Sequence, residues 1–200
     1  MASNKFVSER VFLKNVRVSY PALDEPKSFA GGEPKFECTF LMDENSENAK
    51  TVAATVKKVA TDYFGDKARS VMVGNAIPLH KGSDKNPIPD GYEGSLYIRA
   101  KSKNRPKLVG AKPTQTYTEA LEIREVFRPG NFVNAYITLY AYDKGSRGVA
   151  AMLEAIQFRA VGDPLTGSAN FDFPDESGAG SQSATGMDFE DEEDEEDTPF

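Results

Sequence analysis

The sequence predicts a mainly β (α+β) fold with one main helix and a disordered acidic C-terminal tail. Three observations lead to this prediction: apolar residues alternate with polar ones in several segments, one stretch has helical spacing, and the composition changes near residue 162. We expect residues 1–162 to form one domain. Residues 163–200 should form a Gly/Ser-rich linker and an acidic tail without regular structure.

Strands are expected where side chains alternate between an apolar and a polar face. In 35–42 the apolar residues occupy every second position and should share one buried face. These residues are Phe36, Cys38, Phe40 and Met42. The same reasoning predicts strands over 12–18, 35–42, 95–103, 132–142 and 149–160.

One helix is expected over 45–64, followed by Gly65 as a stop signal. Its apolar residues recur at helical spacing: Val52, Val56, Val59, Ala60 and Tyr63. Residues 74–94 are rich in Gly, Pro, Asn and Asp, which predicts a long loop around a short extended piece at 77–79. Segment 117–128 is compatible with a helix or a strand.

The net charge of −7 conceals two parts of opposite charge. All 24 Lys and Arg residues lie before residue 160, whereas 12 of the 31 Asp and Glu residues lie within 171–200. The chain before residue 171 therefore carries +5 and the last thirty residues carry −12. This is a mildly basic body with a strongly acidic tail.

Cysteine, histidine and hydropathy exclude several classes of protein. One Cys excludes an internal disulfide, one His leaves too few ligands for a typical zinc site, and no apolar run is long enough to span a membrane. No apolar signal stretch follows the first residues. We therefore expect a soluble protein of a reducing cytoplasm, with no membrane partner.

Segment 95–103 combines aromatic and basic side chains on one face. Even positions are Leu96, Ile98 and Ala100; odd positions are Tyr97, Arg99, Lys101 and Lys103. The alternation predicts an apolar row facing inward and an aromatic and basic row facing outward. Segment 99–112 holds six basic residues and no acidic one, because the run continues with Arg105, Lys107 and Lys112. A merely solvated strand face is the alternative.

Segment 132–142 places aromatic rings opposite an aliphatic row. The aliphatic row is Val133, Ala135, Ile137, Leu139 and Ala141, and the other face carries Phe132, Tyr136, Tyr140 and Tyr142. Rings on a solvent-facing sheet need an explanation. Stacking of unpaired bases is one, worth about 1–3 kcal/mol per base. Coverage by the helix or a loop is the other.

Together the two segments supply cations that neutralise phosphates and rings that hold bases without demanding a sequence. The acidic tail adds a competitor: a flexible chain of about 38 residues spans roughly 34 Å, and a body of about 162 residues has a radius of gyration near 15 Å. Its charges can therefore reach a basic groove on the same molecule. Phe200 follows the run of carboxylates, and such a segment would suit a pocket with a basic rim on a partner protein. A solubility role for the tail is the alternative.

The tail residues expected to act in this way are nine carboxylates and the terminal ring: Asp188, Glu190, Asp191, Glu192, Glu193, Asp194, Glu195, Glu196, Asp197 and Phe200. Signals of catalysis are weak. No P-loop is present, His80 lies in the Pro/Gly-rich loop, and Cys38 lies in an apolar row. We expect no enzyme, no catalytic residue, no cofactor and no metal site.

Three segments resemble a phage-encoded family of single-stranded DNA-binding proteins: Ala100–Val109, Phe127–Ala135 and Tyr140–Val149. The resemblance covers roughly residues 8–165. It implies an OB-fold, a five-stranded, partly open barrel that binds oligonucleotides on one face. One departure is that the predicted helix follows the second strand, whereas an OB-fold commonly places its helix between the third and fourth.

The resemblance implies a sequence-tolerant single-stranded DNA-binding protein for phage DNA replication, recombination or repair, in the cytoplasm of the infected bacterial host. Phosphates would contact Arg99, Lys101, Lys103, Arg105, Lys107 and Lys112; bases would stack on Tyr97, Tyr136, Tyr140 and Tyr142, with Arg147 as a further candidate. The tail resembles that of replication single-strand binders, whose acidic C-terminus ending in Phe contacts a polymerase, helicase or primase. A homodimer stays open.

Two other functions remain compatible with the sequence. One is a protein-interaction adaptor or chaperone that acts through the acidic tail. The other is an RNA-binding regulator, because the sequence does not reveal a contact to the 2′-hydroxyl.

Overall fold

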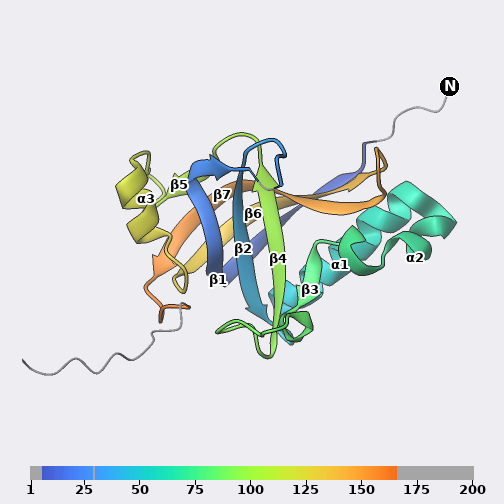
Figure 1. Ribbon diagram of the computed structural model, residues 1–200, viewed down its shortest axis with the longest axis horizontal. Helices are drawn as coiled ribbons and strands as arrows, with labels where there is room; N and C mark the ends of the chain where they lie inside the picture. The colour runs from blue at the N-terminus through green and yellow to red at the C-terminus, as the bar shows by residue number, and fades with distance from the viewer. Residues whose placement is uncertain (1–5, 29, 166–200) are drawn as a thin grey trace, which may run out of the picture. The chain divides into compact units, whose positions relative to one another are not determined.

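The computed structural model describes residues 6–28 and 30–165 (Figure 1). Residues 166–200 of the predicted linker and acidic tail lie outside these residues, so the linker and tail assignments stay predictions. Seven strands form one sheet in the order β3-β4-β2-β1-β6-β7-β5, and β4 also pairs with β7. The strands are β1 (Ser8–Lys27), β2 (Lys35–Asp43), β3 (Leu79–Lys81), β4 (Ser95–Ser102), β5 (Lys107–Val109), β6 (Phe132–Tyr142) and β7 (Gly148–Ala160).

The extra pairing closes five strands into a barrel. β1 pairs antiparallel with β2 and β6, β2 with β4, and β6 with β7. The closing contact is parallel and short, joining Ala100 to Ala151 and Lys101 to Met152. This is an OB-fold-like barrel with β3 and β5 as additional strands, and it confirms the expected fold class.

Alternation along the strands places the core inside the barrel. The aliphatic row of β6 is buried, as are Ile98 and Ala100 of β4. The predicted apolar face of β2 is buried too, with Cys38 and Phe40 fully inaccessible to solvent. All five predicted strands are therefore confirmed, and each predicted apolar row faces the interior.

β1 is much longer than the predicted segment 12–18. Its pairing slips between Leu13 and Val16 and again after Ser19, which are bulges in the ladder. Asn15 and Tyr20, at or beside these slips, have positive φ values of 54° and 44°. Each bulge resets the two-residue alternation, and the first one lies inside the predicted segment, so alternation alone does not give the full length of the strand.

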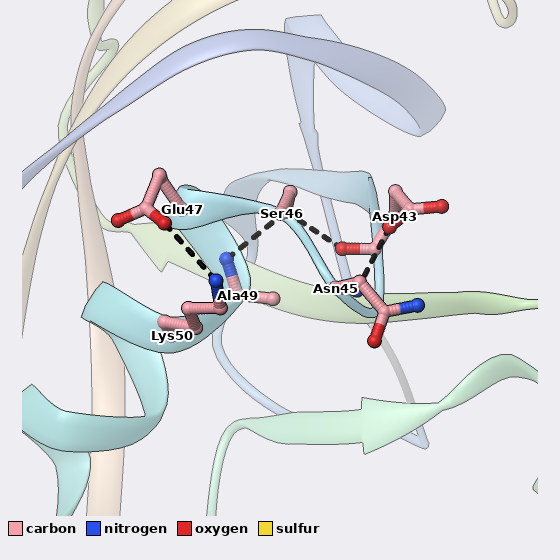
Figure 2. A network of polar contacts seen from close by, with 6 residues as sticks. All are labelled: Asp43, Asn45, Ser46, Glu47, Ala49 and Lys50. Atoms are coloured by element: carbon pink, nitrogen blue, oxygen red, sulfur yellow. Dashed lines mark hydrogen bonds and ion pairs between the residues drawn. The ribbon is translucent and has the colours of Figure 1, made fainter.

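The predicted helix is confirmed as α1 (Glu47–Phe64). Ser46 caps it: Ala49 N–H donates to Ser46 Oγ at 3.2 Å, and Ser46 Oγ donates to the Asp43 carbonyl at 2.6 Å (Figure 2). The cap fixes the turn that leads from β2 into the helix. The helix then buries an apolar stripe in the same core as β6, through Val52, Val56, Val59 and Ala60.

α1 lies between the second and third strands of the barrel, so the departure noted from the sequence is real. The ambiguous segment 117–128 contains a second helix, α3 (Ala120–Val126), between the third and fourth barrel strands. This is the position that an OB-fold helix commonly occupies. α3 is anchored by the buried side chains of Ile123 and Phe127. Figure 1 shows α1 and α3 on opposite sides of the barrel.

Residues 65–94 form short helices and β3, and the last part packs against β1 through Tyr92. The short helices are η1 (Gly65–Lys67), α2 (Ala68–Val71), η2 (Gly74–Ala76) and η3 (Gly82–Asp84). The extended piece expected at 77–79 lies slightly later, in β3. Tyr92 is 1% exposed, and its hydroxyl lies 3.0 Å from Ser19 Oγ. This contact helps to bury Ser19 of β1.

Gly82 allows this loop to pack, and its substitution tests the packing. A Cβ at residue 82 would lie 1.8 Å from the Tyr92 carbonyl oxygen, so Gly82→Ala must displace backbone. We expect a loss of about 1–3 kcal/mol in the free energy of unfolding, measured by urea denaturation. Gly110→Ala is the matched control, because the three atoms nearest to its Cβ all belong to the Gln115 side chain and not to backbone. Equal stabilities for the two variants would contradict the packing described.

Candidate functional site

A groove of about 760 Å³ lies on the outer face of β4, β6 and β7. It brings together six of the side chains selected from the sequence: Tyr97, Arg99, Lys101, Lys103, Tyr140 and Tyr142. Other residues of its lining include Lys35, His80, Asn104, Ala150 and Met152. Aromatic and cationic residues that are far apart in the sequence thus share one concave surface.

The cationic wall comes from β4 because its side chains alternate. Ile98 and Ala100 point into the barrel and are fully buried, so Arg99 and Lys101 point outward. Lys103 follows the strand and is two-thirds exposed. Lys35, at the start of β2, adds a further cation to the lining.

The opposite wall is aromatic, and its depth depends on small residues in β7. Tyr140 pairs with Ala150, and Tyr142 pairs with Gly148. A Cβ at Gly148 would lie 2.8 Å from the Tyr142 hydroxyl and 2.3 Å from the Ala76 carbonyl oxygen. Small side chains on β7 therefore leave the space between the tyrosines of β6 and the cations of β4.

Two of the groove cations form ion pairs with carboxylates. Lys101 Nζ lies 3.2 Å from Glu37 Oε2, and Lys103 Nζ lies 2.8 Å from Glu33 Oε2. The hydrogen bond from Lys103 holds the pKa of Glu33 below its ordinary value. An incoming anion would have to displace these carboxylates.

Tyr97 lines the groove, but neighbouring groups surround its ring. The centroids of His80 and Tyr92 lie 5.3 Å from the Tyr97 centroid, and Lys85 Nζ lies 4.9 Å from it. Lys85 also lies over the rings of Tyr20 and Tyr92. The Tyr97 ring is therefore packed against its neighbours, whereas we expected a ring available for stacking. A contact between Tyr97 and a base stays a prediction.

His80 joins the groove through β3, which pairs with β4 and sets His80 beside Tyr97. Burial lowers the pKa of His80, and the positive charge of Arg99 lowers it further. The imidazole is therefore mainly neutral at pH 7. The sequence pattern predicts a loop around His80 and no part for it in the site, because nothing local shows that β3 pairs with β4.

Five residues selected from the sequence are not among those that line the groove: Arg105, Lys107, Lys112, Tyr136 and Arg147. The guanidinium of Arg105 is engaged outside the groove lining, where it donates hydrogen bonds to the backbone carbonyls of Thr118 and Asp24. Lys107 lies on β5, and Lys112 and Arg147 are exposed in turns. Tyr136 lies on the outer face of β6 against Phe12. Their roles in binding stay predictions.

Residues that the sequence reasoning missed are brought in by pairing between distant segments. Lys35 lines the groove at the start of β2, and Met152 lines it from the outer face of β7. Lys85 packs on the Tyr97 ring. The alternation of 149–160 could have indicated Met152. Lys85 had no usable signal, because its loop has no periodic pattern.

Other chemistry is not evident in the part of the chain that the structure describes. No group of three or more His, Cys, Asp or Glu side chains there is placed to hold a metal ion. Cys38 is fully buried, and burial raises the pKa of its thiol. Among the described helices, none has the length and apolar character needed to cross a membrane.

Comparisons with known proteins agree with this architecture. Protein p50 of Acyrthosiphon pisum secondary endosymbiont phage 1 is 32% identical over 168 residues, covering 79% of this chain and 87% of that protein. The structure of the single-stranded DNA-binding protein from bacteriophage Enc34 in complex with ssDNA has a TM-score of 0.68 and 23% identity, covering 82% of this chain and 99% of that one.

A third similar structure is gp2.5, a single-stranded DNA-binding protein encoded by bacteriophage T7. Its TM-score is 0.54 at 9% identity, with 82% of this chain and 98% of that chain covered. The fold and groove define an OB-fold-like protein with a cationic and aromatic face. The family of the Enterobacter phage Enc34 ssDNA-binding protein matches residues 9–198, and the chain belongs to this family.

The lowered pKa of His80 predicts a pH dependence of stability. The unfolded chain binds a proton at His80 more readily than the folded one, so stability is present above about pH 6.5 and falls as the pH drops below it. Urea midpoints at pH 7.5 and 5.5 measure the slope. His80→Gln should flatten it, since the chain has one His. An unchanged slope would show that His80 does not titrate differently on folding.

Proposed function

We propose that the groove binds single-stranded DNA with little sequence preference and serves phage DNA replication, recombination or repair. Arg99, Lys101 and Lys103 contact phosphates, and bases stack on Tyr140 and Tyr142. The observation that carries this proposal is that cations of β4 and rings of β6 line one open groove. Membership of a single-stranded DNA-binding family supports the choice of ligand.

The physical roles of the two walls differ. Cations along the backbone of a single strand release condensed counterions and supply affinity that falls with salt. Rings hold the bases by stacking, which every base can do, so binding tolerates any sequence. Tyr140 and Tyr142 suit this role better than Tyr97, whose ring is packed against His80, Tyr92 and Lys85.

The position of the groove on the barrel also supports the proposal. OB-folds bind oligonucleotides across the faces of their second and third strands, between the loops that join strands one to two and four to five. Here the third barrel strand is β4. Lys35 follows the first of these loops, and Tyr142 precedes the second, so the groove shares the third strand and the ends of both loops with the usual site. Here β6 and β7 line most of the remainder, and β2 contributes Lys35.

A charge substitution in the groove tests the function. Lys101→Gln should weaken binding of fluorescent oligo-dT and reduce the slope of log affinity against log salt by about 0.7, the value for one lost phosphate contact. Lys107→Gln is the matched control, because Lys107 lies outside the groove lining. Failure of both variants and of the unsubstituted chain to bind oligo-dT would contradict the function. A loss at Lys107 equal to that at Lys101 would contradict the groove as the site.

Removing the carboxylate that pairs with Lys101 should have the opposite effect. Glu37→Gln frees Lys101 from its ion pair, so affinity for oligo-dT should rise by up to about fivefold at low salt. Glu47→Gln is the control, because it breaks an exposed pair with Lys50 on α1 instead. Weaker binding by Glu37→Gln would indicate that Glu37 positions Lys101 for the strand and does not compete with it.

We also propose that the acidic tail competes with DNA for the groove and recruits replication proteins, with Phe200 as an anchor. Replacing the carboxylates of 188–197 by amides in the full chain should raise oligo-dT affinity by roughly tenfold at low salt. The difference should shrink at high salt, where charges are screened. Equal affinities of the two chains at low salt would contradict the competition.

A further inference from the structure

Two exposed aromatic rings form a pair on the outer face of the barrel, beyond the groove lining. Phe12 of β1 and Tyr136 of β6 are directly paired across the strands. Their ring centroids are 4.8 Å apart at an angle of 41°. Phe12 is 44% exposed and Tyr136 is 45% exposed. We call these two rings the outer aromatic pair.

Cations flank the outer aromatic pair along β1. Val11 and Leu13 point into the core, so Arg10, Phe12 and Lys14 form an outward row in which a ring stands between two cations. Arg10 Nε lies 2.7 Å from Glu154 Oε2 and stays two-thirds exposed. In the described part of the chain, no carboxylate lies within ion-pair distance of Lys14. The composition repeats that of the groove.

The outer face of β6 connects the pair to the groove. Tyr136, Thr138 and Tyr140 lie on the same face, and the strand rise of about 3.4 Å per residue sets Tyr136 about 14 Å from Tyr140. Thr138 pairs with Met152, which lines the groove, and with Arg10 on the other side. Arg10 therefore stands between the rings of the groove and the outer aromatic pair.

We propose that the outer aromatic pair is a second base-stacking site, which takes a single DNA strand that continues from the groove along β6, with Arg10 and Lys14 on its phosphates. This inference rests on the proposed function. It extends the binding path from β4 across the barrel to β1 and assigns roles to Phe12, Arg10 and Lys14.

A second protein chain is a poorer occupant for this surface. A stable interface buries about 800 Å² on each partner, whereas two aromatic side chains bury at most about 150–250 Å² each. The surroundings are the cations Arg10 and Lys14, the short polar Thr138, and the carboxylate of Glu154, which is paired with Arg10. Lys14 keeps its charge available, and this suits a polyanion. Charge and size together favour a single strand.

Oligomer length separates the two sites in an experiment. The affinities of the full chain and of the double variant Phe12→Leu/Tyr136→Leu are measured on oligo-dT of about 4 to 16 nucleotides, the range that one OB-fold occupies. We expect equal affinities for the shortest oligomers and a loss of roughly 5- to 100-fold for the longest. Tyr136→Phe keeps the ring and should bind long oligomers as the unsubstituted chain does.

A fluorescent reporter gives a second readout that does not depend on the double variant folding well. The chain has no Trp, so Tyr136→Trp provides a single reporter. Its fluorescence should be quenched by long oligomers that bind, and unaffected by short ones that fill only the groove.

Each contrary result has a distinct meaning. Unchanged affinity of the double variant on all lengths, with no quenching of Trp at 136, overturns the second site while the groove function stands. A change in the sedimentation of the free double variant with unchanged DNA affinity overturns it in favour of a protein contact. Failure of the unsubstituted chain to bind any oligomer contradicts the proposed function itself.

Discussion

The short parallel contact between β4 and β7 is the constraint on which the groove depends. It joins the buried residues Ala100 and Ala151, whose small side chains allow the two strands to approach inside a closed barrel. Closure sets the outward Lys101 of β4 beside Met152 of β7, and Tyr140 and Tyr142 stand farther along β6 beside the small Ala150 and Gly148. Without this contact the cations and the rings would lie on separate edges of an open sheet.

A strand that binds in the groove would exchange one anionic partner of the lysines for another. Lys101 and Lys103 already have carboxylate partners, so a phosphate replaces one anion by another. Each exchange gains less than a contact with a free cation, and a strand must make several contacts and stack its bases to bind well. Such a site favours an extended polyanion with unpaired bases over a small anion.

Much of the fold was predictable from local pattern, because alternation in 95–103 and 132–142 and the helical spacing of 45–64 are local properties that the core preserves. The groove was predictable in its residue types for the same reason. Three features depend on contacts between distant segments and have no local signal: the bulges of β1, the pairing of β3 that brings in His80, and the diversion of Arg105 to backbone carbonyls near α3. Segment 117–128 is ambiguous in the sequence because its helix is stabilised by tertiary contacts. These contacts bury Ile123 and Phe127, and the local pattern does not reveal them.

The most direct test of the groove as the DNA site is photo-crosslinking. Oligo-dT that carries 4-thiothymidine is irradiated in complex with the full chain, and the crosslinked peptides are identified by mass spectrometry. Binding in the groove predicts crosslinks within 97–103 and at Tyr140 or Tyr142. Crosslinks confined to β5 and α3, on residues 107–126, would contradict it.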